Sequence, residues 1–115
     1  MTVIEKVKAI AQNTPWEACS NKNYITFEAF SPQDQNLIIE VEIKAAPVNE
    51  VLSNIYNQLN SFVDNFDVSS EAYLWLDNSG HGKNGAPHDM KDVYEDMEVY
   101  LEYAKELRDA FKKEV

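Results

Sequence analysis

The feature that most limits the fold is a pair of segments, residues 24–30 and 37–44, in which apolar and polar side chains alternate. The apolar positions are Ile25, Phe27, Ala29, Leu37, Ile39, Val41 and Ile43. The polar positions between them are Thr26, Glu28, Glu40, Glu42 and Lys44. This period of two predicts two strands, each with one buried and one solvated face. The polar stretch 31–36 predicts a hairpin loop, so the two strands are expected to be antiparallel.

Three other segments have the spacing of amphipathic helices. The first covers residues 3–13, behind a Thr2–Glu5 pair with capping-box spacing, and ends at Thr14-Pro15. The second begins at Pro47 and carries an apolar stripe to position 63, with residues 64–67 closing it. The third and longest is expected at 87–113. These helices supply the apolar surface that covers one face of the sheet.

Two short segments complete the predicted fold. Residues 16–19 suit an extra strand, turned by residues 20–23. In residues 72–76, Ala72, Leu74 and Leu76 alternate with Tyr73 and Trp75, which predicts a last strand. We therefore expect one α+β domain over residues 1–115, with a small, mostly antiparallel sheet of three or four strands and three helices. The expected order is α-β-β-(β)-α-β-α.

The chain is strongly acidic, with 20 Asp and Glu against 10 Lys and Arg and a net charge of −10. This balance argues against direct binding to nucleic acid or to anionic membranes, both of which attract basic surfaces. A basic protein is the expected partner, and many basic proteins handle nucleic acid. The alternative is that the acidity only keeps the protein soluble. With no signal peptide, no long apolar run and the single Cys19, we expect a cytoplasmic protein.

The negative charge is concentrated in two stretches. Residues 28–77 hold nine acids and one base, and residues 89–102 hold six acids and one base. Acidic residues recur every three or four positions on the last helix, at Glu95, Glu98, Glu102, Glu106 and Asp109. Neighbouring carboxylates in such a row lie about 5–6 Å apart, which resembles a row of phosphates. The row suits either a solvated face or a nucleic-acid mimic, and Glu40 and Glu42 on the wet face of the sheet would extend it.

Exposed aromatic residues are typical anchors of protein interfaces, which adds Tyr73 and Trp75 to the candidate surface unless a helix covers them. The predicted partner-binding residues are Glu40, Glu42, Tyr73, Trp75, Glu95, Glu98, Glu102 and Glu106. The apolar seam of residues 90–111 has heptad spacing, so homodimerisation stays open, although packing of this seam on the sheet is favoured.

Nothing in the sequence predicts catalysis, a metal or a cofactor. Residues 80–85 form a literal G-x-G-x-x-G, but the next helix is expected to begin only at Pro87, and its first turns carry Asp89 and Asp92. These acids would repel a dinucleotide phosphate. The candidate metal ligands Asp77, His81, His88 and Asp89 do not match a calcium loop or a zinc set. Contact of His81 and Lys83 with a partner remains open. The chain is therefore expected not to be an enzyme.

In its eleven asparagines, its 115 residues and its charge of −10, the chain resembles the small acidic proteins of phages and mobile elements. Anti-CRISPR and anti-restriction inhibitors of host defence belong to this group. The resemblance implies a non-catalytic inhibitor that docks its acidic surface on a basic, nucleic-acid-handling host protein. The alternative is an acidic regulatory or structural interaction domain, which leaves room for a homodimer.

Overall fold

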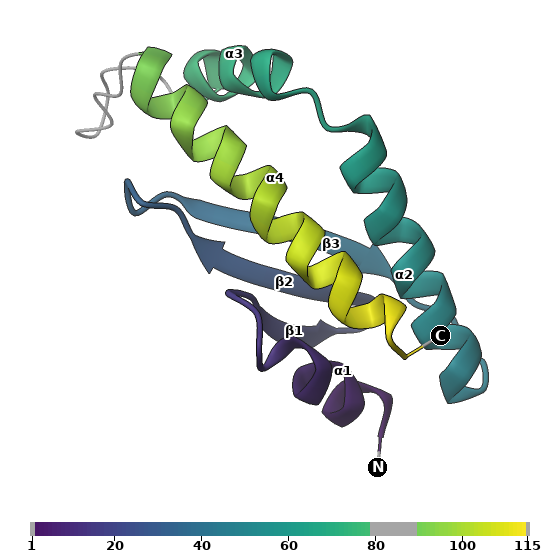
Figure 1. The fold of residues 1–115 in the computed structure, drawn as a ribbon. Coiled ribbons are helices and arrows are strands. Elements are labelled where there is room, and N and C mark those ends of the chain that lie inside the picture. The colour runs from purple at the N-terminus through teal and green to yellow at the C-terminus, as the bar shows by residue number, and fades with distance from the viewer. Residues whose placement is uncertain (1, 79–89, 115) are drawn as a thin grey trace.

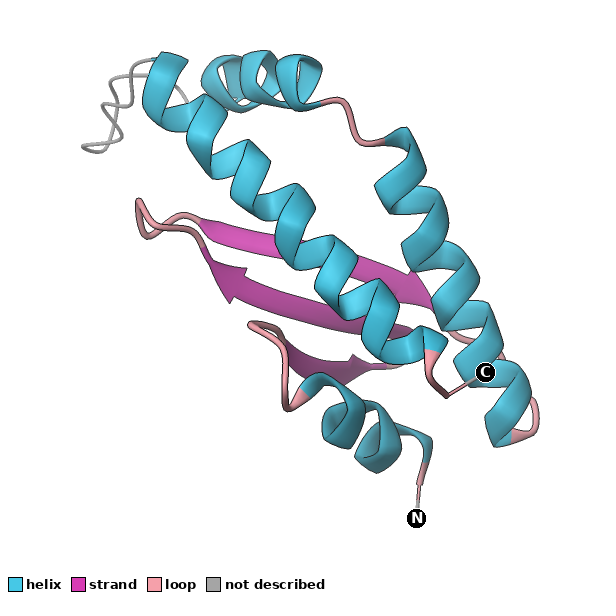
Figure 2. Cartoon of the chain, in the orientation of Figure 1, coloured by secondary structure: helices cyan, strands magenta, loops and turns pink. Residues whose placement is uncertain are grey.

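The computed structural model describes residues 2–78 and 90–114, and it confirms the α+β class with an antiparallel sheet. In chain order the elements are α1 (Val3–Ala11), β1 (Glu17–Asn21), β2 (Tyr24–Phe30), β3 (Asn36–Glu42), α2 (Val48–Asn65), α3 (Val68–Asn78) and α4 (Met90–Lys112). The strands lie in the order β1-β2-β3, and each is antiparallel to its neighbour (Figure 1). Helices α2 and α4 lie over one face of the sheet, and α1 lies beside β1 (Figure 2).

The extra strand predicted at residues 16–19 is present as β1. It turns into β2 through Lys22, whose positive φ of 44° closes a tight connection. Trp16 immediately precedes the strand and is buried. Its indole Nε1 donates a hydrogen bond of 2.8 Å to the carbonyl of Tyr103 in α4. This bond ties the start of the sheet to the last helix.

The strand predicted at residues 72–76 is wrong, because these residues belong to α3. Asp67 caps this helix. Its carboxylate accepts a hydrogen bond of 3.2 Å from the backbone N–H of Ser70, and its carbonyl accepts one of 2.9 Å from the backbone N–H of Glu71. Val68 is half-buried and Ala72, one turn later, is fully buried. Helix α3 packs against α4. The described residues thus form four helices and a three-stranded sheet.

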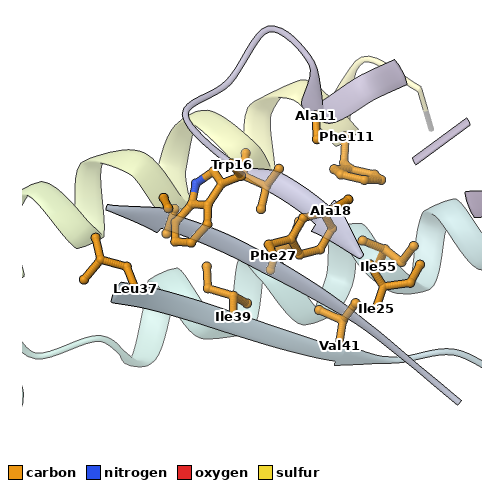
Figure 3. Packing of buried hydrophobic residues seen from close by; sticks show 14 of the residues in the cluster. Ala11, Trp16, Ala18, Ile25, Phe27, Leu37, Ile39, Val41, Ile55 and Phe111 are labelled. Atoms are coloured by element: carbon orange, nitrogen blue, oxygen red, sulfur yellow. The ribbon is translucent and has the colours of Figure 1, made fainter. Parts of the chain in front are cut away.

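The hydrophobic core lies between the sheet and the helices. Ile25, Phe27, Leu37, Ile39 and Val41 project from β2 and β3 toward the helices (Figure 3). They meet a helical layer in which the largest fully buried side chains are Leu52, Ile55, Leu59, Met97, Leu107 and Phe111. The rings of Phe27 and Phe111 pack edge to face with centroids 6.0 Å apart. Each such side chain contributes about 1.5–3 kcal/mol on burial.

A buried polar contact joins the β2–β3 hairpin to α4. Ser31 and Asp96 are both buried, and the Ser31 hydroxyl donates to the Asp96 carboxylate at 2.8 Å. The same Ser31 oxygen accepts from the backbone N–H groups of Gln33 and Gln35 at 3.2 and 2.9 Å. The hairpin loop predicted from composition is therefore confirmed, and one hydroxyl both shapes it and anchors it.

Candidate protein-binding surface

None of the described elements covers the face of the sheet opposite the helices. We call it the open face: its outward positions are Glu17, Cys19 and Asn21 of β1, Tyr24, Thr26, Glu28 and Phe30 of β2, and Asn36, Ile38, Glu40 and Glu42 of β3. All of them are exposed except Thr26, which is half-buried. The strict alternation of the strands therefore leaves a complete sheet face in water.

Four carboxylates stand on the open face. The register places Glu17 directly opposite Glu28, and Glu40 opposite Thr26, while Glu42 lies opposite Tyr24. The three strands contain no Lys, Arg or His. Among the described residues, none of these four carboxylates forms an ion pair. Like charges directly opposite each other destabilise a sheet, so the Glu17–Glu28 pair lowers the stability of the isolated protein.

Large apolar side chains accompany these carboxylates. Phe30 is 66% exposed, Ile38 45% and Tyr24 40%. Phe30 and Ile38 are diagonal neighbours, because Ile38 lies opposite Glu28 and Phe30 lies opposite Asn36. They lie at the hairpin end of the open face, with Tyr24 at the other end. Removing such side chains from water is favourable, so this face has both a charge and an apolar surface to offer a partner.

The acidic row predicted on the last helix forms a separate surface. Glu95, Glu98, Glu102 and Glu106 are all exposed, on the side of α4 that points away from its buried seam. We call this the α4 row. Bases lie on the same helix. Lys105 lies 3.5 Å from Glu102, which is the member of the row with an ion pair among the described residues, and Arg108 lies 3.1 Å from Asp109, just beyond the row. Charges paired in this way are typical of a solvated helix surface.

Glu40 and Glu42 do not extend the α4 row. They point away from the helices, whereas the row lies on the outer side of a helix that covers the opposite face of the sheet. The whole sheet lies between the two groups (Figure 2). The sequence alone could not separate them, because a period of two identifies the wet side of a strand but not the side on which a distant helix packs.

The aromatic candidates Tyr73 and Trp75 lie on α3 rather than on a strand. Tyr73 is 64% exposed, and the neighbouring Leu74 is 51% exposed. The side chain of Trp75 lies outside the described part of the structure. Tyr73 is therefore accessible, but it belongs to neither acidic surface.

The open-face residues Tyr24, Glu28, Phe30 and Ile38 were not among the predicted binding residues. Their signal was present in the sequence: each occupies a position that alternates with the buried residues of its strand. Phe30 and Ile38 are the stronger signal, because a large apolar residue on the wet side of a strand is more unusual than a charged one.

The seam of α4 is not available for pairing with a second copy. Val93, Met97, Ala104, Leu107 and Phe111 are all buried within the chain. The preferred prediction, packing on the sheet, is confirmed by the Phe27–Phe111 contact. Dimerisation through this seam would require the core to open.

One ionisable group lies where α4 meets the edge of the sheet. The hydroxyl of Tyr100 donates to the backbone carbonyl of Ile38 in β3. The pKa of Tyr100 is raised to about 12, mainly by burial and also by the negative charge of Glu71, while the hydrogen bond to Ile38 opposes the shift. Tyr100 is therefore protonated over the physiological range and serves as a hydrogen-bond donor to β3.

The described residues contain no group of three or more His, Cys, Asp or Glu that could hold a metal ion. Residues 80–85, with the G-x-G-x-x-G sequence, lie outside the described part of the structure, as do His81, Lys83, His88 and Asp89. No helix in the described ranges, 2–78 and 90–114, is long and apolar enough to span a bilayer.

A scan against protein-family models finds no match, and neither do searches among curated proteins and solved structures. What this chain does must therefore be inferred from the chemistry of its own surfaces.

Proposed function

We propose that this chain is a non-catalytic protein-binding domain that docks a basic partner on its open face. The observation that carries the proposal is the exposure of Phe30, 66%, on a sheet face with four carboxylates and no base. The apolar side chains supply a desolvated anchor, and the carboxylates attract and orient a cationic surface. Both are needed, because buried apolar area mainly determines affinity and charge mainly determines association rate and selectivity.

The same chemistry narrows the class of partner. A second copy of the chain is disfavoured face to face, since eight carboxylates would meet without a cation. A surface that normally binds phosphates is favoured, because it presents Lys and Arg side chains. Unpaired carboxylates can bind these side chains in place of phosphates. We therefore propose a nucleic-acid-handling protein as the partner, with inhibition by occupation of its nucleic-acid site. A host-defence nuclease is the specific form of this proposal that the compositional resemblance supports.

The test compares two variants with the same change in charge. One carries Glu17→Gln, Glu28→Gln, Glu40→Gln and Glu42→Gln on the open face. The other carries Glu95→Gln, Glu98→Gln, Glu102→Gln and Glu106→Gln on the α4 row. Each immobilised variant is used to capture proteins from a bacterial lysate at low and high salt, and retained proteins are quantified by mass spectrometry.

We expect specific proteins that the wild-type chain and the α4 variant retain equally, and that the open-face variant loses by at least about tenfold. Retention should fall at high salt, because partly exposed ion pairs are screened. If the α4 variant loses the partner and the open-face variant keeps it, the proposal is wrong about the surface. If both keep it, charge is not what recognises the partner.

A further inference from the structure

A groove of about 590 Å³ runs along the free edge of β3, between this strand and α2. Its polar lining from α2 consists of Asn54, Asn57, Gln58, Ser61 and Asn65. Among the described residues, its ionisable lining consists of Glu40 of β3 and Glu71 of α3, and Phe62 and Phe66 add an apolar part. The described lining is therefore acidic and amide-rich, and it contains no cation.

The register of the sheet determines which backbone groups face this groove. The backbone N–H of Ile43 donates to Asn23 at 2.7 Å, and that of Ser31 donates to Gln35 at 2.9 Å. In this register the odd-numbered residues of β3 pair with β2, and the even-numbered residues direct their N–H and C=O groups to the free edge. Ile38, Glu40 and Glu42 are therefore the edge positions next to the groove.

Two of these three positions are already occupied by side chains. Gln58 of α2 pairs with Glu42 like a strand residue: its Oε1 accepts from the Glu42 N–H at 2.9 Å, and its Nε2 donates to the Glu42 carbonyl at 2.7 Å. Tyr100 donates to the carbonyl of Ile38. Between them, the backbone N–H and C=O of Glu40 form no hydrogen bond to any residue in the described ranges. Side chains therefore occupy both backbone groups of Glu42 and the carbonyl of Ile38, on either side of Glu40.

An open strand edge binds extended peptides through main-chain hydrogen bonds. The Gln58–Glu42 pair shows that the groove accepts an amide group in this geometry two residues away. A residue pairing with Glu40 would also place its side chain beside that of Glu40, on the open face, since paired residues on adjacent strands point to the same side. Opposite charges are favourable at that position, so the paired residue should be basic.

We propose that an extended segment of the basic partner lies in this groove and pairs one Arg or Lys residue with Glu40. Its backbone exchanges two hydrogen bonds with Glu40, its cationic side chain lies beside the Glu40 carboxylate, and flanking polar groups contact the asparagines of α2. This inference rests on the proposed function and specifies how the partner is held.

The projected size of the open face supports an additional contact. The strands have five, seven and seven residues. At about 3.3 Å per residue and about 4.8 Å between strands, their face projects to about 300 Å². Even doubled for the relief of the side chains, this is below the roughly 800 Å² per partner of a standard interface. The groove continues the surface at the β3 edge, where Glu40 contributes its side chain to the open face and its backbone to the groove.

The test uses the ¹⁵N-labelled chain and the blocked peptide acetyl-Ser-Thr-Arg-Thr-Ser-amide. One control peptide is N-methylated at the arginine, which removes the donor that would pair with Glu40, and a second has Glu in place of Arg. So short a contact predicts a dissociation constant of about 1 mM. We expect the Glu40 amide resonance to move on titration and its hydrogen exchange to slow by about tenfold at saturation.

The N-methylated peptide and the Glu peptide should bind at least about tenfold more weakly than the Arg peptide. The substitution Ser61→Arg, at an exposed position in the groove, should weaken binding of the Arg peptide by a similar factor. A Glu40 amide that does not respond, or an N-methylated peptide that binds equally well, would overturn the inference. In the lysate capture, a partner could be lost by the open-face variant but retained by the Ser61→Arg variant. This result would overturn the proposed binding in the groove and would leave the proposed function standing. A partner kept by the open-face variant would overturn the proposed function itself.

Discussion

The open face of the sheet and the α4 row each present four glutamates, yet their surroundings differ. On α4, Lys105 and Arg108 lie within 3.5 Å of neighbouring acids, and the helix already buries its apolar side. On the open face no base is interspersed, and Phe30 and Ile38 remain in water. A count of charges cannot separate a solvating surface from a binding surface. The neighbours of those charges differ. On α4, Glu102 and Asp109 have basic partners and the apolar side of the helix is buried, whereas the acids of the open face have no paired base among the described residues and lie beside exposed apolar groups.

The strongest test of this comparison is Phe30→Thr, which removes the aromatic side chain and puts in its place a β-branched residue that also favours strands. We expect partner affinity to fall by about 30-fold, corresponding to about 2 kcal/mol for an aromatic side chain that the partner removes from water. The matched control is Tyr73→Ala on α3, where the side chain is equally exposed at 64% against 66%. Titration of the retained partner, followed by calorimetry, measures both. Equal losses of affinity in the two variants would show that the exposure of an aromatic side chain, rather than its location on the open face, determines partner binding.

The attachment of the open face to α4 can be tested with Ser31→Ala. The substitution removes the hydroxyl that donates to Asp96 and accepts from Gln33 and Gln35. We expect the free energy of unfolding to drop by about 2 kcal/mol, since the buried Asp96 carboxylate loses this donor and two loop N–H groups lose their acceptor. Urea unfolding measures the loss, and Ser20→Ala on exposed β1 should change stability by less than about 0.5 kcal/mol. Similar values for the two variants would contradict the anchoring role of Ser31.

The contact of Tyr100 with the β3 edge predicts a dependence of stability on alkaline pH. The pKa of Tyr100 is raised from 10.0 to about 12 in the folded protein, so the folded state holds this proton more tightly than the unfolded state. Its contribution is complete below pH 10 and is lost as pH rises from 10 toward 12.

Tyr100→Phe should cost about 1 kcal/mol near pH 7, through loss of the hydrogen bond to Ile38. It should also make the decline in stability above pH 10 shallower than in the wild-type chain. Chemical unfolding at several pH values checks both expectations. An unchanged slope would mean that another group causes the alkaline loss.

The smallest expected effect is a change in stability that has opposite signs on the two acidic surfaces. Glu28→Gln removes a like-charge contact with Glu17, so it should stabilise the protein by about 0.2–1 kcal/mol. Lys105→Gln removes an ion pair with Glu102 and should destabilise it by no more than about 0.5 kcal/mol. Thermal unfolding at low salt measures both. If Glu28→Gln destabilises the fold, the open face is not under electrostatic strain.

Most of the sheet could be predicted from the sequence, because the alternation in β2 and β3 leaves only one register of buried residues. The same argument placed Glu40 and Glu42 on the wet side. The segment 72–76 was mistaken because five residues of alternating size fit a strand as well as a helix. The deciding signal was Asp67, which caps α3 but was interpreted as the end of the preceding helix.

The candidate surface was predictable only in part. Helical spacing correctly indicated that Glu95, Glu98, Glu102 and Glu106 are exposed. It could not show that the sheet separates them from Glu40, because that depends on which face α4 covers. The groove at β3 was also beyond the sequence, since it results from Gln58 and Tyr100 reaching edge positions that lie 16 and 62 residues away in the chain.

The lone cysteine allows the central claim to be tested without disturbing the open face. Cys19 is exposed and lies on that face, opposite Thr26. Its alkylation by iodoacetamide can be followed by intact mass spectrometry, with and without the partner retained from the lysate. The matched control is a Cys19→Ser, Glu102→Cys double variant, which moves the thiol to the α4 row.

We predict that the partner slows alkylation of Cys19 by at least about tenfold, because a docked surface excludes the reagent from the strand face. The thiol on the α4 row should react at the same rate with and without the partner. Protection of the α4 thiol together with unchanged reactivity of Cys19 would contradict the account and assign binding to the other acidic surface.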